Sequence, residues 1–254
     1  MLNYNEFGTG PALLIAHGLY GSAKNWGVIA KRLSDRRRVV VVDMRNHGDS
    51  PRFDTHSYPD MANDLAEVIE HIGAPVDVLG HSMGGKASMA LALTRPELVR
   101  SLISADIAPV SYTHSQIHSI EAMRAVDLNT VTRRAEANEQ LEAQGVSAKL
   151  QSFFTQSIDI SRKPWKLNFD ALAADMDKIL SFPTLAGSYD GPTLFLSGAE
   201  SDYVTREQRP IVKPLFPNAR FAKIPEAGHW LHSERPRAFE SAVRTYLDAV
   251  SKQG

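Results

Sequence analysis

The feature that most restricts the fold of this chain is the alternation of short apolar segments with segments of helical periodicity. Over the first 105 residues, strands are expected at 2–7, 12–17, 38–43, 76–79 and 98–105. Helices are expected at 26–33, 61–72 and 84–94. Short strands that alternate with helices favour parallel pairing with right-handed crossovers. The sequence therefore predicts the α/β class, with a mostly parallel central sheet flanked by helices.

The alternation is interrupted once, in the second half of the chain. Residues 109–190 show helical patterns and no convincing core strand, whereas strands are expected again at 193–197 and 220–224. Helices are expected at 206–216 and 236–250. In open α/β sheets, ligands bind beyond the carboxyl ends of the strands, so an insertion there covers the active-site edge. We therefore divide the chain into a core at 1–108 and 191–254 and a helical lid, or cap, at 109–190.

A G-x-S-x-G motif occurs at residues 80–84, between an expected strand and an expected helix. This strand–turn–helix context is typical of a nucleophile elbow, in which a strained turn exposes the serine hydroxyl. Glycines must flank the serine because side chains there would collide. The motif predicts that Ser82 is a nucleophile at the edge of the sheet.

A serine hydroxyl needs a neighbouring base to become a good nucleophile. In proteins with this motif the base follows the serine and the acid along the chain. His229 lies in a loop after the last expected strand and before the last expected helix. We predict that His229 is the general base, and His232 is a weaker candidate.

The oxyanion of an acyl-transfer reaction needs two preorganised hydrogen-bond donors. The backbone N–H of Met83, directly after the serine, is the first candidate. The second is the N–H of Leu19, in the loop that follows the strand ending at His17. Gly18 allows the backbone of this loop to turn toward the substrate.

The acid that orients the histidine has two candidates in the sequence. Asp106 follows the strand expected at 98–105, and Asp202 follows the strand expected at 193–197. The second position is the usual one, but the usual Gly-x-x-Asp spacing after Gly198 would place the acid at Ser201. The residues alone leave Asp106 and Asp202 as alternatives.

The chain resembles the bacterial YbfF-type esterases of the α/β-hydrolase superfamily. The resemblance covers nearly the whole chain and is clearest at residues 17–22, 45–48, 80–87, 106–110 and 228–230. It implies the α/β-hydrolase fold and a serine carboxylesterase that needs no cofactor or metal. The implied substrates are small-molecule esters with short to medium acyl groups, with acyl thioesters as a further candidate class. In that family the acid opens the Asp-Ile-Ala-Pro-Val segment, which is Asp106 here, and Asp202 is a departure from the family pattern.

Other reactions use the same catalytic residues. A C–C bond hydrolase and a haloperoxidase-like perhydrolase are alternatives, and a non-catalytic ligand-binding relative is an alternative of a different class. Serine at the nucleophile position argues against haloalkane dehalogenases and epoxide hydrolases, which use aspartate there.

Three further patterns have weaker interpretations. The turn at 43–50, which includes His47, is expected to brace neighbouring loops. His114 and His118 have a spacing that can hold a metal, but no third ligand is apparent, so no metal site is predicted. The aromatic residues of the insertion are expected to form its own small core or to line an acyl pocket: Phe153, Phe154, Trp165 and Phe169.

The composition limits partners and location. A formal net charge of -1 gives no electrostatic surface for nucleic acid. The sequence contains no cysteine, which excludes disulfides and thiolate metal sites and fits a reducing compartment. No apolar run approaches the ~18 residues of a membrane span, and no signal peptide is apparent. We expect a cytoplasmic protein without stable membrane insertion; its oligomeric state is left open.

Overall fold

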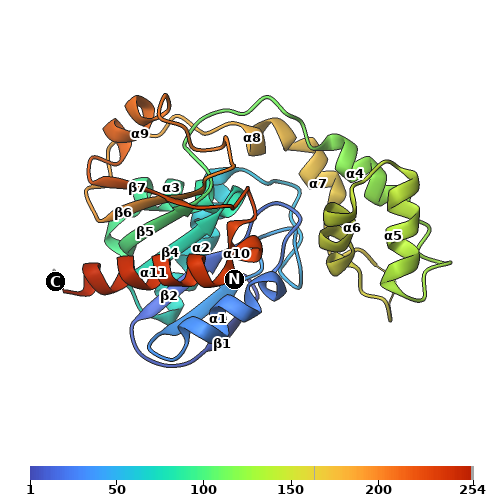
Figure 1. The fold of residues 1–254 in the computed structure, drawn as a ribbon, viewed down its shortest axis with the longest axis horizontal. Helices are drawn as coiled ribbons and strands as arrows, with labels where there is room; N and C mark the ends of the chain where they lie inside the picture. The colour runs from blue at the N-terminus through green and yellow to red at the C-terminus, as the bar shows by residue number, and fades with distance from the viewer. Residues whose placement is uncertain (163, 253–254) are drawn as a thin grey trace.

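The computed structural model describes residues 1–162 and 164–252 and is built on a seven-stranded sheet (Figure 1). The strand order is β1-β3-β2-β4-β5-β6-β7. β1 pairs antiparallel with β3, and every other pair is parallel, which confirms the mostly parallel sheet. The strands are β1 (Tyr4–Phe7), β2 (Ala12–Ala16), β3 (Arg38–Val42), β4 (Val76–His81), β5 (Val99–Ala105), β6 (Thr193–Gly198) and β7 (Ala219–Ile224).

Helices cover both faces of this sheet, which explains why its central strands are apolar throughout. Alternate residues point to opposite faces of a strand. Leu13 of β2 packs in a cluster with Phe239 and Val243, from α11 (Pro236–Ser251), and with residues of α1 (Gly27–Leu33). Leu14 packs in the opposite cluster, with residues of α2 (Tyr58–Ile72) and α3 (Met83–Thr94). β2 is thus buried on both sides and fixes the centre of the molecule.

The ends of two helices differ from those expected. α2 begins at Tyr58 rather than at residue 61, because the Ser57 side chain accepts the N–H of Asp60 and Pro59 lies in the first turn. The helix expected at 206–216 is the shorter α9 (Arg209–Leu215), with Pro210 in its first turn. The remaining short elements of the core are η1 (Ala23–Trp26), η2 (Pro96–Leu98) and α10 (Leu231–Glu234).

The turn between β4 and α3 is strained at one residue. Ser82 has φ 52° and ψ −120°, a backbone conformation that side-chain-bearing residues rarely adopt. A Cβ atom at Gly80 would lie 2.2 Å from the carbonyl oxygen of Gly84, and one at Gly84 would lie 2.4 Å from the carbonyl oxygen of Ala16. The two glycines therefore let the helix start pack directly against β4 and β2, as the motif predicts.

The segment between β5 and β6 is largely helical and lies to one side of the sheet (Figure 1). Its helices are α4 (Ile117–Arg124), α5 (Arg134–Ala143), α6 (Ala148–Phe154), η3 (Thr155–Ser157), α7 (Phe169–Ala174) and α8 (Met176–Leu180). In the described part of the chain, no helix has both the length and the apolar character needed to cross a membrane.

We expect Gly84→Ala to destabilise the protein strongly, because its Cβ would overlap the Ala16 backbone rather than a movable side chain. The loss should reach several kcal/mol or prevent folding, as overpacking in a core does. The measurement is the free energy of unfolding in urea.

Gly27→Ala is the matched control. Gly27 is helical, with φ −55°, and a Cβ there would meet nothing within 4 Å. This substitution should leave stability unchanged or raise it by about 0.5–1 kcal/mol. Equal effects of the two substitutions would contradict the close packing at Gly84.

Candidate active site

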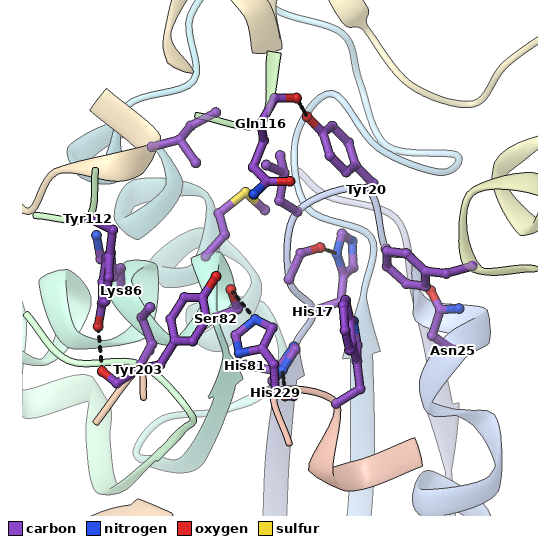
Figure 2. Close-up of a pocket in the computed structure, with 18 of the residues that line it drawn as sticks. His17, Tyr20, Asn25, His81, Ser82, Lys86, Tyr112, Gln116, Tyr203 and His229 are labelled. Atoms are coloured by element: carbon purple, nitrogen blue, oxygen red, sulfur yellow. Dashed lines mark hydrogen bonds between the residues drawn. The ribbon is translucent and has the colours of Figure 1, made fainter. Parts of the chain in front are cut away.

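Three side chains from distant parts of the chain meet at the carboxyl edge of the sheet. Figure 2 shows two of them, Ser82 and His229. Ser82 Oγ lies 3.2 Å from His229 Nε2, and His229 Nδ1 lies 2.8 Å from Asp106 Oδ2. Ser82 follows β4, Asp106 follows β5, and His229 lies between β7 and α10. A hydroxyl, an imidazole and a carboxylate are thus connected in series, which is the geometry of a base-activated nucleophile.

The Asp106 carboxylate is fully buried and held from three sides. Besides the contact with His229, Asp106 Oδ1 accepts the Gly198 N–H at 3.0 Å, and Oδ2 accepts the Ser201 hydroxyl at 2.5 Å. Ser201 occupies the position where the usual spacing after Gly198 would put an acid, so the sequence contained a signal for its importance.

Asp202, the alternative acid, lies elsewhere. Its side chain is exposed, and within the described residues Asp106 is the carboxylate that contacts the His229 imidazole. The structure therefore brings Ser82, His229 and Asp106 together and leaves Asp202 outside this group.

Two backbone N–H groups are free beside Ser82. Across residues 1–162 and 164–252, no hydrogen bond involves the N–H of Leu19 or of Met83. A Cβ atom on Gly18 would lie 3.2 Å from Ser82 Cβ, so the loop that carries Leu19 lies against the serine. Among the described residues, both N–H groups proposed from sequence are thus unpaired, and Leu19 and Met83 line the same cavity as Ser82.

Buried histidines hold the loop that carries Leu19. His47 Nε2 accepts the Tyr20 N–H at 3.1 Å, and His17 Nε2 accepts the Met44 N–H at 2.9 Å. An accepting Nε2 places the proton on Nδ1, which donates to the carbonyl of Arg45 in His47 and of Gly18 in His17. Burial lowers the pKa of both imidazoles, which keeps them neutral acceptors.

The turn at 43–50 braces its neighbours, as the sequence predicts. The Asp43 carboxylate accepts hydrogen bonds from the backbone N–H of Ala23 and Asp49, at 2.7 and 3.0 Å, and from the Asn3 side chain at 2.9 Å. This carboxylate therefore ties the N-terminal segment, the loop after β2 and the turn after β3 into one unit behind the site.

The His229 ring is also fixed by residues that sequence reasoning missed. Tyr203 stacks on it, with ring centres 4.0 Å apart, and His81 donates to its backbone carbonyl at 2.8 Å. His114 Nε2 lies 2.6 Å from the Tyr203 hydroxyl. His114 therefore hydrogen-bonds a tyrosine, and the described residues contain no group of three His, Cys, Asp or Glu side chains suited to a metal.

A mostly apolar cavity of about 350 Å³ opens beside Ser82. The inserted helices contribute Leu150, Phe153 and Phe154 to its wall. Trp165 and Phe169 instead contact each other, 5.6 Å apart, and are not among the described residues that line the cavity. These four aromatic residues thus divide between the two predicted roles: Phe153 and Phe154 line the cavity, and Trp165 and Phe169 pack within the insertion.

The chain is similar to several known proteins over most of its length. A family model described as alpha/beta hydrolase fold matches residues 11–236. The sn-1-specific diacylglycerol lipase ABHD11 of Mus musculus is 41% identical, and the match covers 97% of this chain and 85% of the relative. Esterase YbfF of Escherichia coli is 36% identical, covering 96% of this chain and 95% of the relative. A solved marine microorganism esterase superposes with a TM-score of 0.91 at 36% identity, over 96% of this chain and 98% of that one.

We expect stability to fall as pH decreases from 7 to 5.5. Burial lowers the pKa of His56 and of His232 to about 3 in the folded protein. As pH falls through about 6.5, these two imidazoles therefore bind protons only in the unfolded chain. Each such histidine should lower the free energy of unfolding by up to about 1.4 kcal/mol per pH unit below about pH 6.5. Urea unfolding at several pH values measures the slope.

His232→Phe should make the dependence of the free energy of unfolding on pH shallower by the contribution of one histidine. The phenyl ring can keep the stacking on Trp26, 4.2 Å away, and the substitution removes a buried Nδ1 that has no hydrogen-bond partner among the described residues. His71→Gln, on the exposed face of α2, is the control and should leave the slope unchanged. An unchanged slope in His232→Phe would contradict the prediction.

Proposed function

The chain belongs to the α/β-hydrolase family and is an ester hydrolase of the esterase or lipase type, and we propose that it works through an acyl-enzyme formed on Ser82. The observation that carries this proposal is the series of contacts from the Ser82 hydroxyl through His229 to the buried Asp106. A non-catalytic binding protein would not require a strained backbone at Ser82 to keep this hydroxyl beside an imidazole.

The first half-reaction forms the acyl-enzyme. His229 Nε2 takes the hydroxyl proton while Ser82 Oγ attacks the carbonyl carbon of the ester. The N–H groups of Leu19 and Met83 donate to the negative oxygen of the tetrahedral intermediate. The carbonyl re-forms, the bond to the alcohol oxygen breaks, and His229 delivers its proton to the departing alcohol.

The second half-reaction releases the acid. His229 takes a proton from water, and the resulting hydroxide attacks the acyl carbon. Ser82 leaves as the alcohol and recovers its proton from His229. Throughout, Asp106 accepts the Nδ1–H of His229, which keeps Nε2 available as a base and stabilises the imidazolium.

The proposed substrates are small esters with short to medium acyl groups. The size and apolar wall of the cavity fit such groups, and the names of the two relatives, a diacylglycerol lipase and an esterase, both denote ester hydrolysis. Acyl thioesters have the same reacting carbonyl and are included in the proposal. The geometry gives no specific support for C–C bond hydrolysis or perhydrolysis.

We also propose that residues 109–190 act as a cap on a core formed by 1–108 and 191–254. Leu150 and Phe153 of the inserted helices line the cavity, and Tyr20 of the core connects to the insertion through its hydroxyl, which donates to the Gln116 carbonyl at 3.0 Å. These contacts support a cap that covers the route by which an acyl group reaches Ser82.

Asp106→Asn should lower kcat for a nitrophenyl ester by about 10⁴-fold, because an amide no longer holds the correct tautomer of His229. Asp202→Asn is the matched control and should stay within a few-fold of the wild type, since that side chain is exposed. Steady-state kinetics at constant pH measure both. A large loss in Asp202→Asn with little loss in Asp106→Asn would move the acid to the later position.

A second variant tests whether an acid at position 201, after β6, can replace the acid at position 106, after β5. Ser201 Oγ contacts the same Asp106 oxygen that faces His229. The double variant Asp106→Asn/Ser201→Asp should therefore recover part of the activity lost in Asp106→Asn. Ser201→Asp alone introduces a second carboxylate next to Asp106 and should be less active than the wild type. No recovery in a folded double variant would show that the 201 position cannot orient the imidazole.

A further inference from the structure

Lys86 is a buried cation in the wall of the catalytic cavity. It lies on α3, four residues after Ser82, and its residue exposure is 1%. Figure 2 shows Lys86 and Tyr112 on one side of Ser82 and Asn25 on the other. Lysine is almost never fully buried unless an anion pairs with it, so this position requires an explanation.

The contacts of the ammonium group stabilise its buried charge only in part. Lys86 Nζ donates to the carbonyl oxygens of Leu180 and Ser181, at 2.9 and 2.7 Å, at the end of α8. It also lies 4.8 Å from the centre of the Tyr112 ring and 5.6 Å from that of Tyr58. These partners are neutral, and an ammonium has three N–H bonds, so among the described residues no hydrogen-bond acceptor takes the third N–H.

The cavity supplies no counter-charge. Lys86 forms no ion pair with any described residue, and no Asp or Glu occurs among the described residues that line the cavity. Lys86 is also the only Lys or Arg among those lining residues. The described wall near Ser82 is thus mostly apolar, and Lys86 is its one lysine or arginine side chain.

We propose that Lys86 binds a carboxylate at the far end of the acyl group, so that preferred substrates are monoesters or monothioesters of short dicarboxylic acids. The proposal rests on the proposed ester hydrolysis and names its substrate class. Ser82 and Lys86 are one helical turn apart, roughly 6 Å along the axis, so a short acyl chain attached at Ser82 can place its second carboxylate beside the ammonium. An anion there would complete the third hydrogen bond and neutralise the buried charge.

The titration of Lys86 agrees with this geometry. Burial lowers its pKa to about 7, with no nearby charge opposing the shift. An ammonium that lacks an anionic partner is costly to bury, and a cleft residue with such a perturbed pKa is typical of functional sites. A bound carboxylate would favour the charged form.

A purely structural role predicts a different outcome. If Lys86 only anchors the end of α8, its removal would affect all esters equally, whereas a binding role affects anionic acyl groups selectively. The experiment therefore compares nitrophenyl hydrogen glutarate with nitrophenyl pentanoate, which have the same leaving group and acyl chains of equal length. The enzyme-free rate is subtracted for each, because hemiesters can react with their own carboxylate.

For the wild type we expect kcat/KM to be higher for the glutarate hemiester than for the pentanoate ester. In Lys86→Met the ratio of the two values should fall at least about tenfold. Lys149→Met is the matched control: Lys149 lies near the cavity over Trp230 and pairs with Glu234, and its removal should leave the ratio unchanged. The same ratio in Lys86→Met and the wild type, or a wild-type preference for the neutral ester, would overturn the proposal.

Inhibition of the wild type keeps the test decisive if Lys86→Met does not fold. Glutarate should inhibit pentanoate-ester hydrolysis at a concentration at least about tenfold lower than pentanoate does, because only glutarate has a second carboxylate for Lys86. Equal inhibition would overturn the proposal. Turnover of the neutral ester in these assays tests the ester hydrolase activity separately, so failure of the Lys86 inference is distinguishable from failure of the proposed function.

Discussion

The strained turn at Ser82 is the constraint on which the rest of the site depends. The left-handed backbone at this residue holds the hydroxyl above the sheet edge, and this turn exists only because Gly80 and Gly84 allow β4, α3 and β2 to approach at backbone distance. The free N–H of Met83 is a direct result, since the first N–H groups of a helix have no partner within it. One local geometry thus presents both the hydroxyl and one candidate oxyanion donor.

The sheet aligns the other groups with this turn. Parallel strands bring their carboxyl ends to one edge, so the loops after β2, β4, β5 and β7 meet there although they are far apart in sequence. Asp106 reaches His229 from the strand next to β4, and Ser201 remains at the usual acid position one strand further on, hydrogen-bonded to Asp106. The carboxylate is therefore supported by the strand end that would ordinarily provide it.

Much of this arrangement was predictable from the sequence, for a physical reason. Strand periodicity, the glycine pattern around Ser82 and the loop position of His229 are local signals, and the fold followed from them. The choice between Asp106 and Asp202 stayed open from the residues alone, because it depends on how β5 and β6 lie against β7. Stacking of Tyr203 on His229 and the buried environment of Lys86 are also contacts between distant segments, which no local pattern encodes. The start of α9 was placed too early because Pro210 fits a first helical turn as well as an interior break.

The claim at the centre of this account is that the Ser82 hydroxyl is an activated nucleophile. Reaction of the folded protein with a fluorophosphonate, followed by peptide mass spectrometry, tests it directly. We predict one adduct, located on Ser82, that is absent from Ser82→Ala and forms orders of magnitude more slowly in His229→Ala. A folded wild-type protein that does not react, or an adduct that persists in Ser82→Ala, would contradict the account.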